Sequence, residues 1–150
     1  MKEKIVTAAQ WIALAFFSVS FLAACDTLPK QGGSKDVNDL SLNAGLSQEQ
    51  IVERRFNERW DAVIAKDYAK AYQYLSPPMR EMVSLSAFES AVGGGQFKGI
   101  EFRETQCVED VCSVKFFLTY DYGQVKGIRT MTGEKWFFQN GQAWFNLPED

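Results

Sequence analysis

The chain contains no histidine among its 150 residues. Histidine is the side chain that most readily acts as a general base near neutral pH, and it is the commonest metal ligand. Its absence excludes a Ser-His-Asp triad and a Cys-His pair, and it leaves carboxylates and tyrosines for acid–base chemistry. We therefore expect no metal and no cofactor, and a binding protein is better supported than an enzyme.

Clusters of basic residues are also lacking. The 16 lysines and arginines stand against 19 aspartates and glutamates, and the formal net charge is −3. A protein that binds nucleic acid usually presents a basic patch or stripe to the phosphates. The composition thus predicts no nucleic-acid partner, and it offers no basic surface for anionic lipid.

The N-terminal 24 residues have the pattern of a targeting segment. Lys2 and Lys4 precede an apolar run that ends in small residues and a cysteine, within the stretch FLAACDTLPK. The motif LAAC, which ends at Cys25, resembles the lipobox of bacterial lipoproteins, in which the signal peptide is cleaved before the cysteine and the cysteine is acylated. The resemblance implies a signal peptide over residues 1–24 and a lipid anchor on Cys25, with the protein facing the periplasm or the cell exterior. Residues 25–46 are predicted to be a flexible tether to a single domain over residues 47–150.

Only two cysteines follow Cys25, and four residues separate them. A two-residue turn at Glu109 and Asp110 would place Cys107 opposite Cys112 in a non-hydrogen-bonded pair of a β-hairpin. Such a pair is close enough for a disulfide, which an oxidising compartment would preserve. The alternative is a metal or redox pair, for which two thiols without histidine supply too few ligands. We predict a structural disulfide.

Residues 47–95 have the pattern of helices. Ser47 and Gln50 form a capping box at the start of a helix that is expected to end near Lys66. Asp67 is placed to cap a second helix, which the prolines at positions 77 and 78 would stop. A third helical stretch in two pieces should follow, with another capping box at Ser86 and a stop at the three glycines 93–95.

From about residue 98 onward the apolar period changes from that of a helix to that of a strand. A strand over Val111–Tyr122 places most of its apolar side chains on one face. Asn140-Gly141 is a strong hairpin signal that pairs Phe138 with Ala143, and it leaves bulky apolar groups on both faces of the sheet. The helices would cover one face. Either a homodimer partner or the curvature of the sheet and its own C-terminal tail would cover the other.

Helices followed by antiparallel strands predict an α+β fold, with N-terminal helices packed on a curved antiparallel sheet. The stretches RWDAVIAKDYAKAYQYLSPPMRE and WFFQNGQAWF resemble the nuclear-transport-factor-two-like superfamily, which includes ketosteroid isomerase and many domains without catalytic activity. The resemblance implies a cone-shaped sheet around an apolar pocket. Arg59 then falls where the isomerases carry their oxyanion-hole tyrosine, and Glu81 is the only acid near the position of their catalytic aspartate. The isomerase pattern is broken at both positions.

Six residues from the helices and the sheet would line the implied pocket. They are Trp60, Tyr72, Phe88, Arg103, Phe116 and Tyr120. Arg103 is a special case, because the pairing of the two cysteines places Arg103 and Glu101 on the apolar face of their strand. Either a β-bulge near residues 103–106 turns the strand, which we favour, or both side chains enter the pocket as polar groups.

These patterns favour a non-catalytic binding or accessory module with an apolar cavity, held at a membrane through Cys25. One alternative is a small lyase- or isomerase-like enzyme, in which Glu81 or Glu101 acts as a base in apolar surroundings beside a tyrosine. Another is an interaction module that docks an envelope protein through its aromatic sheet face. The expected partners are the membrane, a small apolar ligand or an envelope protein, and a second copy of the chain.

Overall fold

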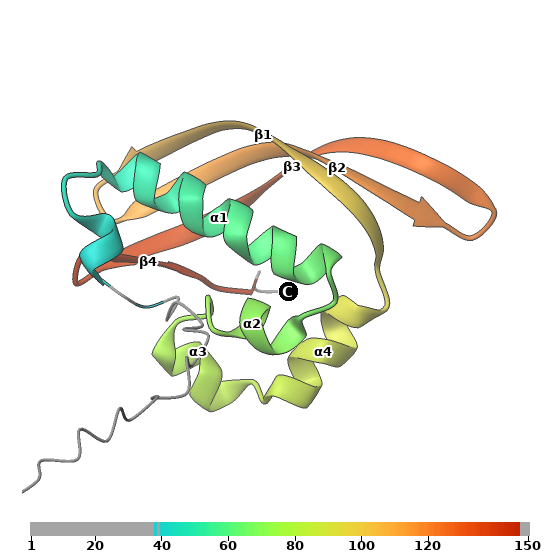
Figure 1. Ribbon diagram of the computed structural model, residues 1–150, viewed down its shortest axis with the longest axis horizontal. Helices are drawn as coiled ribbons and strands as arrows, with labels where there is room; N and C mark the ends of the chain where they lie inside the picture. The colour runs from blue at the N-terminus through green and yellow to red at the C-terminus, as the bar shows by residue number, and fades with distance from the viewer. Residues whose placement is uncertain (1–37, 39, 148–150) are drawn as a thin grey trace, which may run out of the picture. The chain divides into compact units, whose positions relative to one another are not determined.

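The computed structural model describes residue 38 and residues 40–147, all of which belong to the unit Ser34–Asp150 (Figure 1). The predicted signal peptide, Cys25 and most of the predicted tether lie outside the described residues. Within the described residues, a short 3-10 helix precedes four α-helices and four strands. These elements are η1 (Leu40–Asn43), α1 (Gln48–Ile64), α2 (Tyr68–Tyr72), α3 (Pro77–Met82), α4 (Leu85–Gly93), β1 (Gln96–Val108), β2 (Val111–Tyr122), β3 (Val125–Gln139) and β4 (Gln142–Phe145).

Helix α1 begins where the sequence predicts. The Ser47 side chain accepts a hydrogen bond from the Gln50 backbone, and the Gln50 side chain accepts one from the Ser47 backbone, which completes the capping box. The helix ends at Ile64, slightly before the expected Lys66. Lys66 has a positive φ of 62°, so the chain leaves the helical conformation there and turns toward α2.

The two prolines start a helix rather than stop one. Asp67 caps α2 as expected, but α2 already ends at Tyr72. Pro77 and Pro78 occupy the first turn of α3, where a missing N–H costs nothing, and Ser76 caps that helix. The last helix is capped by Ser84, not by the predicted Ser86, and it ends at the first of the three glycines.

The strands form one antiparallel sheet in the order β1-β2-β3-β4. Both predicted hairpin registers are confirmed. Cys107 pairs with Cys112 at a Cα–Cα distance of 4.0 Å and forms the predicted disulfide, and Phe138 pairs with Ala143 across the turn at Asn140. The α+β class is therefore confirmed as an open four-stranded antiparallel sheet with helices.

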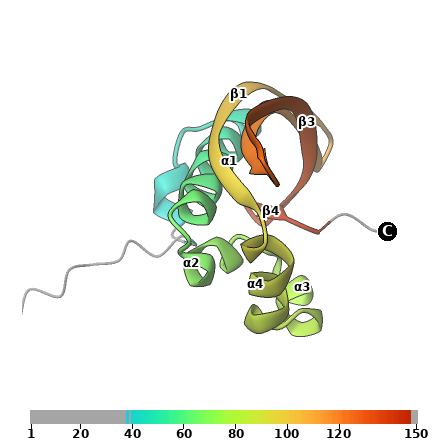
Figure 2. The same cartoon turned by 90° about the vertical axis from the view of Figure 1, so that its right-hand side faces the viewer.

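The sheet is strongly curved, and Figure 2 shows its strands curling into an arch beside the helices. Strand β1 carries two register irregularities, one at Lys98 and one at Arg103, and extra residues of this kind bend and twist a strand. Gly133 of β3 lies against β2, where a Cβ would stand 2.9 Å from the carbonyl oxygen of Val114. Glycine therefore lets the two backbones approach closely at this point.

The core lies between α1 and the inner face of the sheet. Phe56 of α1 contacts Phe116 of β2 edge to face, with ring centroids 4.8 Å apart, and Trp60 packs on the same ring. Val114 and Trp136, from neighbouring strands, are buried beside them. The alternation of β2 thus places its inner side chains against the helix, as the sequence predicts.

The folded part of the chain begins before Ser47, which corrects the boundary predicted for the tether. Asn43 of η1 is buried, and its side-chain amide donates to the Gly141 carbonyl at 2.6 Å and to the Gln142 side chain at 2.8 Å. The side-chain oxygen of Asn43 in turn accepts a hydrogen bond from the Arg54 guanidinium of α1. These bonds fix the segment just before α1 onto the final hairpin.

Candidate functional site

A large hollow lies where the inner face of the sheet meets the end of β4 and helix α3. Its volume is about 560 Å³, within the range typical of small-ligand sites. Apolar side chains make up most of its wall. The lining residues are Trp60, Met79, Phe116, Leu118, Thr132, Gly133, Glu134, Lys135, Phe137, Phe145, Asn146 and Leu147. We call this hollow the β3 groove.

Residues 132–135 are consecutive in β3, and all of them line the groove. Successive side chains of a strand point to opposite faces of the sheet, so a hollow on one face would be lined only by every second residue. The groove must therefore open along the edge of β3, where the backbone itself is accessible. It is an edge groove rather than a closed cavity beneath the sheet.

Glu134 is the acidic residue of the groove, and its side chain is only 10% exposed. One carboxylate oxygen accepts from the indole N–H groups of Trp60 at 3.3 Å and Trp136 at 3.1 Å. The other oxygen accepts from the Arg59 guanidinium. Three donors occupy most of the roughly four lone-pair positions of a carboxylate, so one position remains for a ligand N–H or O–H.

Arg59 holds this carboxylate from the helix side. Its side chain is 4% exposed, and its guanidinium lies 4.0 Å from the ring centroid of Phe145 and 4.9 Å from that of Trp60. Stacking on aromatic faces suits the planar guanidinium and shields the ion pair from water. Arg59 therefore positions the Glu134 carboxylate.

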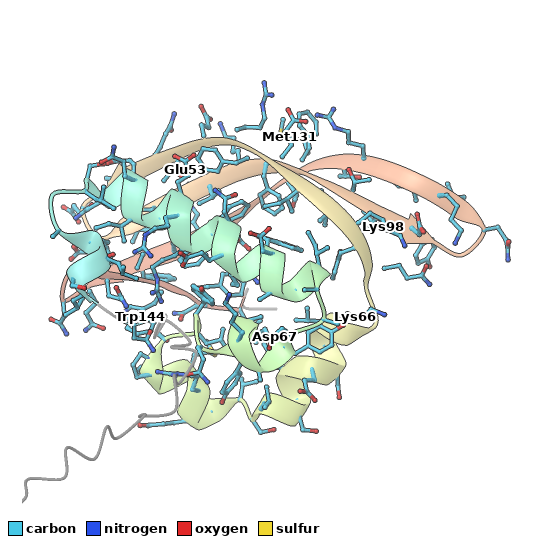
Figure 3. All side chains as sticks on the ribbon, viewed as in Figure 1. Glu53, Lys66, Asp67, Lys98, Met131 and Trp144 are labelled. Atoms are coloured by element: carbon cyan, nitrogen blue, oxygen red, sulfur yellow. A yellow bond between two sulfur atoms is a disulfide. The ribbon has the colours of Figure 1, made fainter. Side chains whose placement is uncertain are left out.

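A second buried arginine, Arg55, lies one turn earlier in α1. It donates to the Ala143 carbonyl at 2.6 Å, and its guanidinium lies 4.9 Å from the ring centroid of Tyr74 and 5.1 Å from that of Trp144. Trp144 is labelled in Figure 3. Burial lowers the pKa of Arg55 to about 10, and the neighbouring Tyr74 partly offsets this effect. The same environment raises the pKa of the Tyr74 phenol, first through burial and then through Glu58. This pair ties α1 to β4 and does not reach the groove lining.

Of the six predicted pocket residues, only Trp60 and Phe116 line the groove. Tyr120 lines a smaller hollow of about 240 Å³, which shares Leu118 and Thr132 with the groove. Tyr72 and Phe88 instead pack against each other between α2 and α4, with ring centroids 5.7 Å apart. The Tyr72 hydroxyl donates to the carbonyls of Arg80 and Val83, so it fixes the connection between helices.

Arg103 lies outside the groove, which corrects its assignment to the pocket lining. The favoured β-bulge is present, with the register shift between Phe102 and Glu104, and it turns the Arg103 side chain to the outside, where it is 52% exposed. There its guanidinium pairs with Glu101 at 2.7 Å. Glu101 also pairs with Arg129, and Arg129 stacks over Phe117 on the outer face of the sheet.

The two carboxylates considered as catalytic bases do not converge on a pocket. Glu81 is exposed on α3, and Glu101 is half exposed on β1. Hydrogen bonds from Arg129 and Arg103 hold the pKa of Glu101 below its usual value of 4.5, which makes it a weaker base. Within the described residues, no group of three or more acidic or cysteine side chains could hold a metal ion.

Sequence reasoning missed Glu134, although a signal for it was present. Arg55 and Arg59 recur at helical spacing with Val52, Phe56 and Val63, so both fall on the apolar face of α1. A buried arginine needs an anion or a carbonyl as partner. That spacing could have indicated a buried acid on the sheet, but not which one.

No protein-family model and no curated protein matches this chain. Among solved structures, a SEC-C motif-containing protein from Rhodopseudomonas palustris matches with a TM-score of 0.54 at 14% identity, over 65% of this chain and 76% of the other. A SEC-C motif-containing protein from Psychrobacter arcticus matches with a TM-score of 0.55 at 12% identity, over 72% and 65%. At these identities the likeness concerns the fold alone.

These matches correct the family resemblance. The neighbours in structure are SEC-C motif-containing proteins rather than members of the nuclear-transport-factor-two-like superfamily. A run of helices followed by aromatic strands is shared by many α+β folds, so that pattern could not single out one superfamily. Within residues 38 and 40–147, no helix is both long and apolar enough to span a bilayer.

Proposed function

We propose that this protein is a non-catalytic binding module whose β3 groove holds the apolar part of a ligand. The observation that carries the proposal is the groove itself, about 560 Å³ with a mostly aromatic and aliphatic wall. Ligand sites of this kind combine a large apolar surface with a few fixed polar groups. Here Glu134 is the fixed polar group, and three donors hold it in place.

The arrangement of Glu134 suits the orientation of a ligand. Hydrogen bonds from three buried donors fix the carboxylate and leave one acceptor position. The carboxylate is therefore suited to orient a ligand N–H or O–H beside the apolar wall.

We also propose that the module is held at a membrane, facing the periplasm or the cell exterior, by a lipid on Cys25. The basis is the lysine-flanked apolar segment that ends in LAAC. The disulfide between Cys107 and Cys112 supports this location, because such bonds persist in oxidising compartments. The test is the mass of the N-terminal peptide of protein purified from producing cells. An unmodified Cys25 in an uncleaved chain would contradict the anchor.

Two methionines of α3 provide a matched test of the groove. Met79 lines the groove, whereas Met82 lies on the same short helix outside the groove lining and is 80% exposed. Glutamine is close to methionine in size and shape but polar, so Met79→Gln adds a polar group to the wall with little change in volume. The probe is N-phenyl-1-naphthylamine, an apolar dye whose fluorescence rises when it leaves water.

We expect the full chain to bind the dye. Met79→Gln should weaken dye binding about tenfold, a loss of about 1.4 kcal/mol in binding free energy. Met82→Gln should leave the dye affinity within about twofold. Thermal unfolding of each variant checks that the fold is intact. Equal dye affinity for the two variants, or no binding to the unmodified chain, would contradict the proposed site.

A further inference from the structure

Strand β3 has one side that no other strand covers within the described residues. On one side it pairs with β2 along nearly its whole length, from Val125 to Phe137. On the other side β4 pairs only with residues 136–139 and then turns away. Phe145 at the end of β4 exchanges hydrogen bonds with the segment around Leu75 instead of continuing along β3. Residues 125–135 thus form a free edge.

The register identifies which backbone groups this edge presents. The Phe138 N–H donates to the Asp110 carbonyl at 2.7 Å, so the polar groups of Phe138 point toward β2. In an antiparallel ladder this direction alternates from residue to residue, and the register has no shift between Phe137 and Ile128. The backbone N–H and C=O groups that point toward the free edge therefore belong to Arg129, Met131, Gly133 and Lys135.

The free edge and the β3 groove meet at residues 132–135. A strand laid along the edge would bond to the backbone of Gly133 and Lys135 and would direct every second side chain into the groove. We propose that the groove and the free edge of β3 together bind an extended, acidic segment of a partner polypeptide, which adds to the sheet as a strand. This inference rests on the proposed binding function and names its ligand class.

Side-chain chemistry determines what such a segment must carry. On its inner side it meets the apolar wall formed by Phe116, Leu118 and Leu147, so the side chains that point inward should be apolar. On its outer side it meets Lys135, whose backbone groups face the same edge and whose amine donates to Ser113 rather than to a carboxylate. The other cation of this edge, Arg129, already pairs with Glu101. A segment that alternates apolar and acidic residues satisfies both sides.

The charge of β3 also disfavours a second copy of this chain as the occupant. Most charges of the strand already have partners, because Lys126 pairs with Asp121, Arg129 with Glu101 and Glu134 with Arg59. Lys135 donates to Ser113 and pairs with no carboxylate in the part of the chain that the structure describes. A second copy of the strand offers Lys135 no unpaired carboxylate, and like charges placed opposite each other destabilise strand pairing. Basic residues on an edge strand oppose self-pairing in this way, while they attract an acidic segment.

The test uses the full chain and a capped peptide of about seven residues in which valine alternates with glutamate. Amide hydrogen exchange is followed by NMR with and without the peptide. We expect binding to slow exchange at least about tenfold at Met131, Gly133 and Lys135. Exchange at Thr132 and Glu134, whose amides already face β2, should change little. A peptide that alternates valine with lysine serves as the control and should not protect these amides.

A charge reversal provides a second readout. Lys135→Glu should weaken the acidic peptide about tenfold, while Lys98→Glu, on β1 and separated from β3 by β2, should leave its affinity within about twofold. Lys98 is 57% exposed and pairs with Asp121, so both variants alter exposed lysines.

Four results would overturn the inference. Peptide binding without protection of the edge amides would contradict strand addition. Strand addition by a partner would also be contradicted if those amides were protected before any peptide is added and the molecular mass were doubled. A second copy of the chain would then occupy the edge. If the naphthylamine dye binds but the acidic peptide does not, strand addition fails while the proposed groove stands. If neither probe binds, both fail.

Discussion

The ion pair between Arg59 and Glu134 gives the sharpest test of how the groove is built. Glu134→Gln removes the negative charge but keeps a carbonyl oxygen, so the hydrogen bonds from the two indole N–H groups to the side chain can persist. The change therefore isolates the bond to Arg59, whose side chain is 4% exposed. The guanidinium would be left buried without an anion.

Breaking a buried ion pair by removal of one partner costs about 3–5 kcal/mol, because the remaining charge is not compensated. Glu134 is still 10% exposed, so we expect a loss near the lower limit, about 3 kcal/mol. With a urea m-value of about 1.5 kcal/mol/M, the unfolding midpoint should fall by about 2 M. Such a shift is easily measured by circular dichroism.

Two further variants make this prediction specific. Arg59→Met combined with Glu134→Gln leaves no buried charge at this ion pair. The double variant should therefore be about 2 kcal/mol more stable than the sum of the two single losses predicts. Glu104→Gln is the matched control, because Glu104 is a strand carboxylate 44% exposed that pairs with an exposed lysine. If Glu134→Gln shifts the midpoint no more than Glu104→Gln does, or if the two single losses simply add, the reasoning is wrong.

Three other predictions concern the sheet. Replacing Cys107 and Cys112 together with serine should lower the free energy of unfolding by about 2 kcal/mol, measured as a fall in the urea midpoint relative to the oxidised protein. Gly133→Ala should cost about 1–3 kcal/mol, because its Cβ would stand 2.9 Å from a carbonyl oxygen of β2; an unchanged midpoint would contradict this close approach. Because the pKa of Glu101 is lower in the folded state than its usual 4.5, this group stabilises the fold above that pH, and the contribution is lost as the pH falls below it. Glu101→Gln should therefore show a smaller fall in midpoint between pH 6 and pH 3 than the unmodified protein.

The hairpins and most helix ends could be predicted because their causes are local. The pairing of Cys107 with Cys112 follows from a two-residue turn, and that of Phe138 with Ala143 follows from an Asn-Gly turn. The start of α1 follows from a capping box that spans four residues. In each case the residues that determine the geometry are neighbours in the sequence.

Features that depend on distant residues could not be predicted in the same way. Asn43 belongs to the folded part because its side chain bonds to Gly141 and Gln142, which follow it by 98 and 99 positions in the sequence. No local pattern indicates that contact. Glu134 pairs with Arg59 across 75 positions of sequence. The position of α3 illustrates a different error, since Pro77 is compatible both with a stop and with the first turn of a helix.

The family assignment failed for a related reason. The quoted stretches fix a succession of helices and aromatic strands, but they do not fix how far the sheet closes. Bulges at Lys98 and Arg103, together with Gly133, shape the curl of the sheet, and these depend on strand registers. As a result, only some of the predicted pocket residues lie at the groove. Trp60 and Phe116 reach the groove, while Arg103 points outward.

The binding role proposed for β3 requires that its edge beside the groove is open and able to pair. Amide hydrogen exchange on the full chain without any ligand tests this requirement. We expect an alternating pattern, with slow exchange at Thr130, Thr132 and Glu134, whose amides bond to β2, and fast exchange at Gly133 and Lys135. Equally slow exchange at all five positions would mean that the edge is already covered, and the binding role assigned to it would then be wrong.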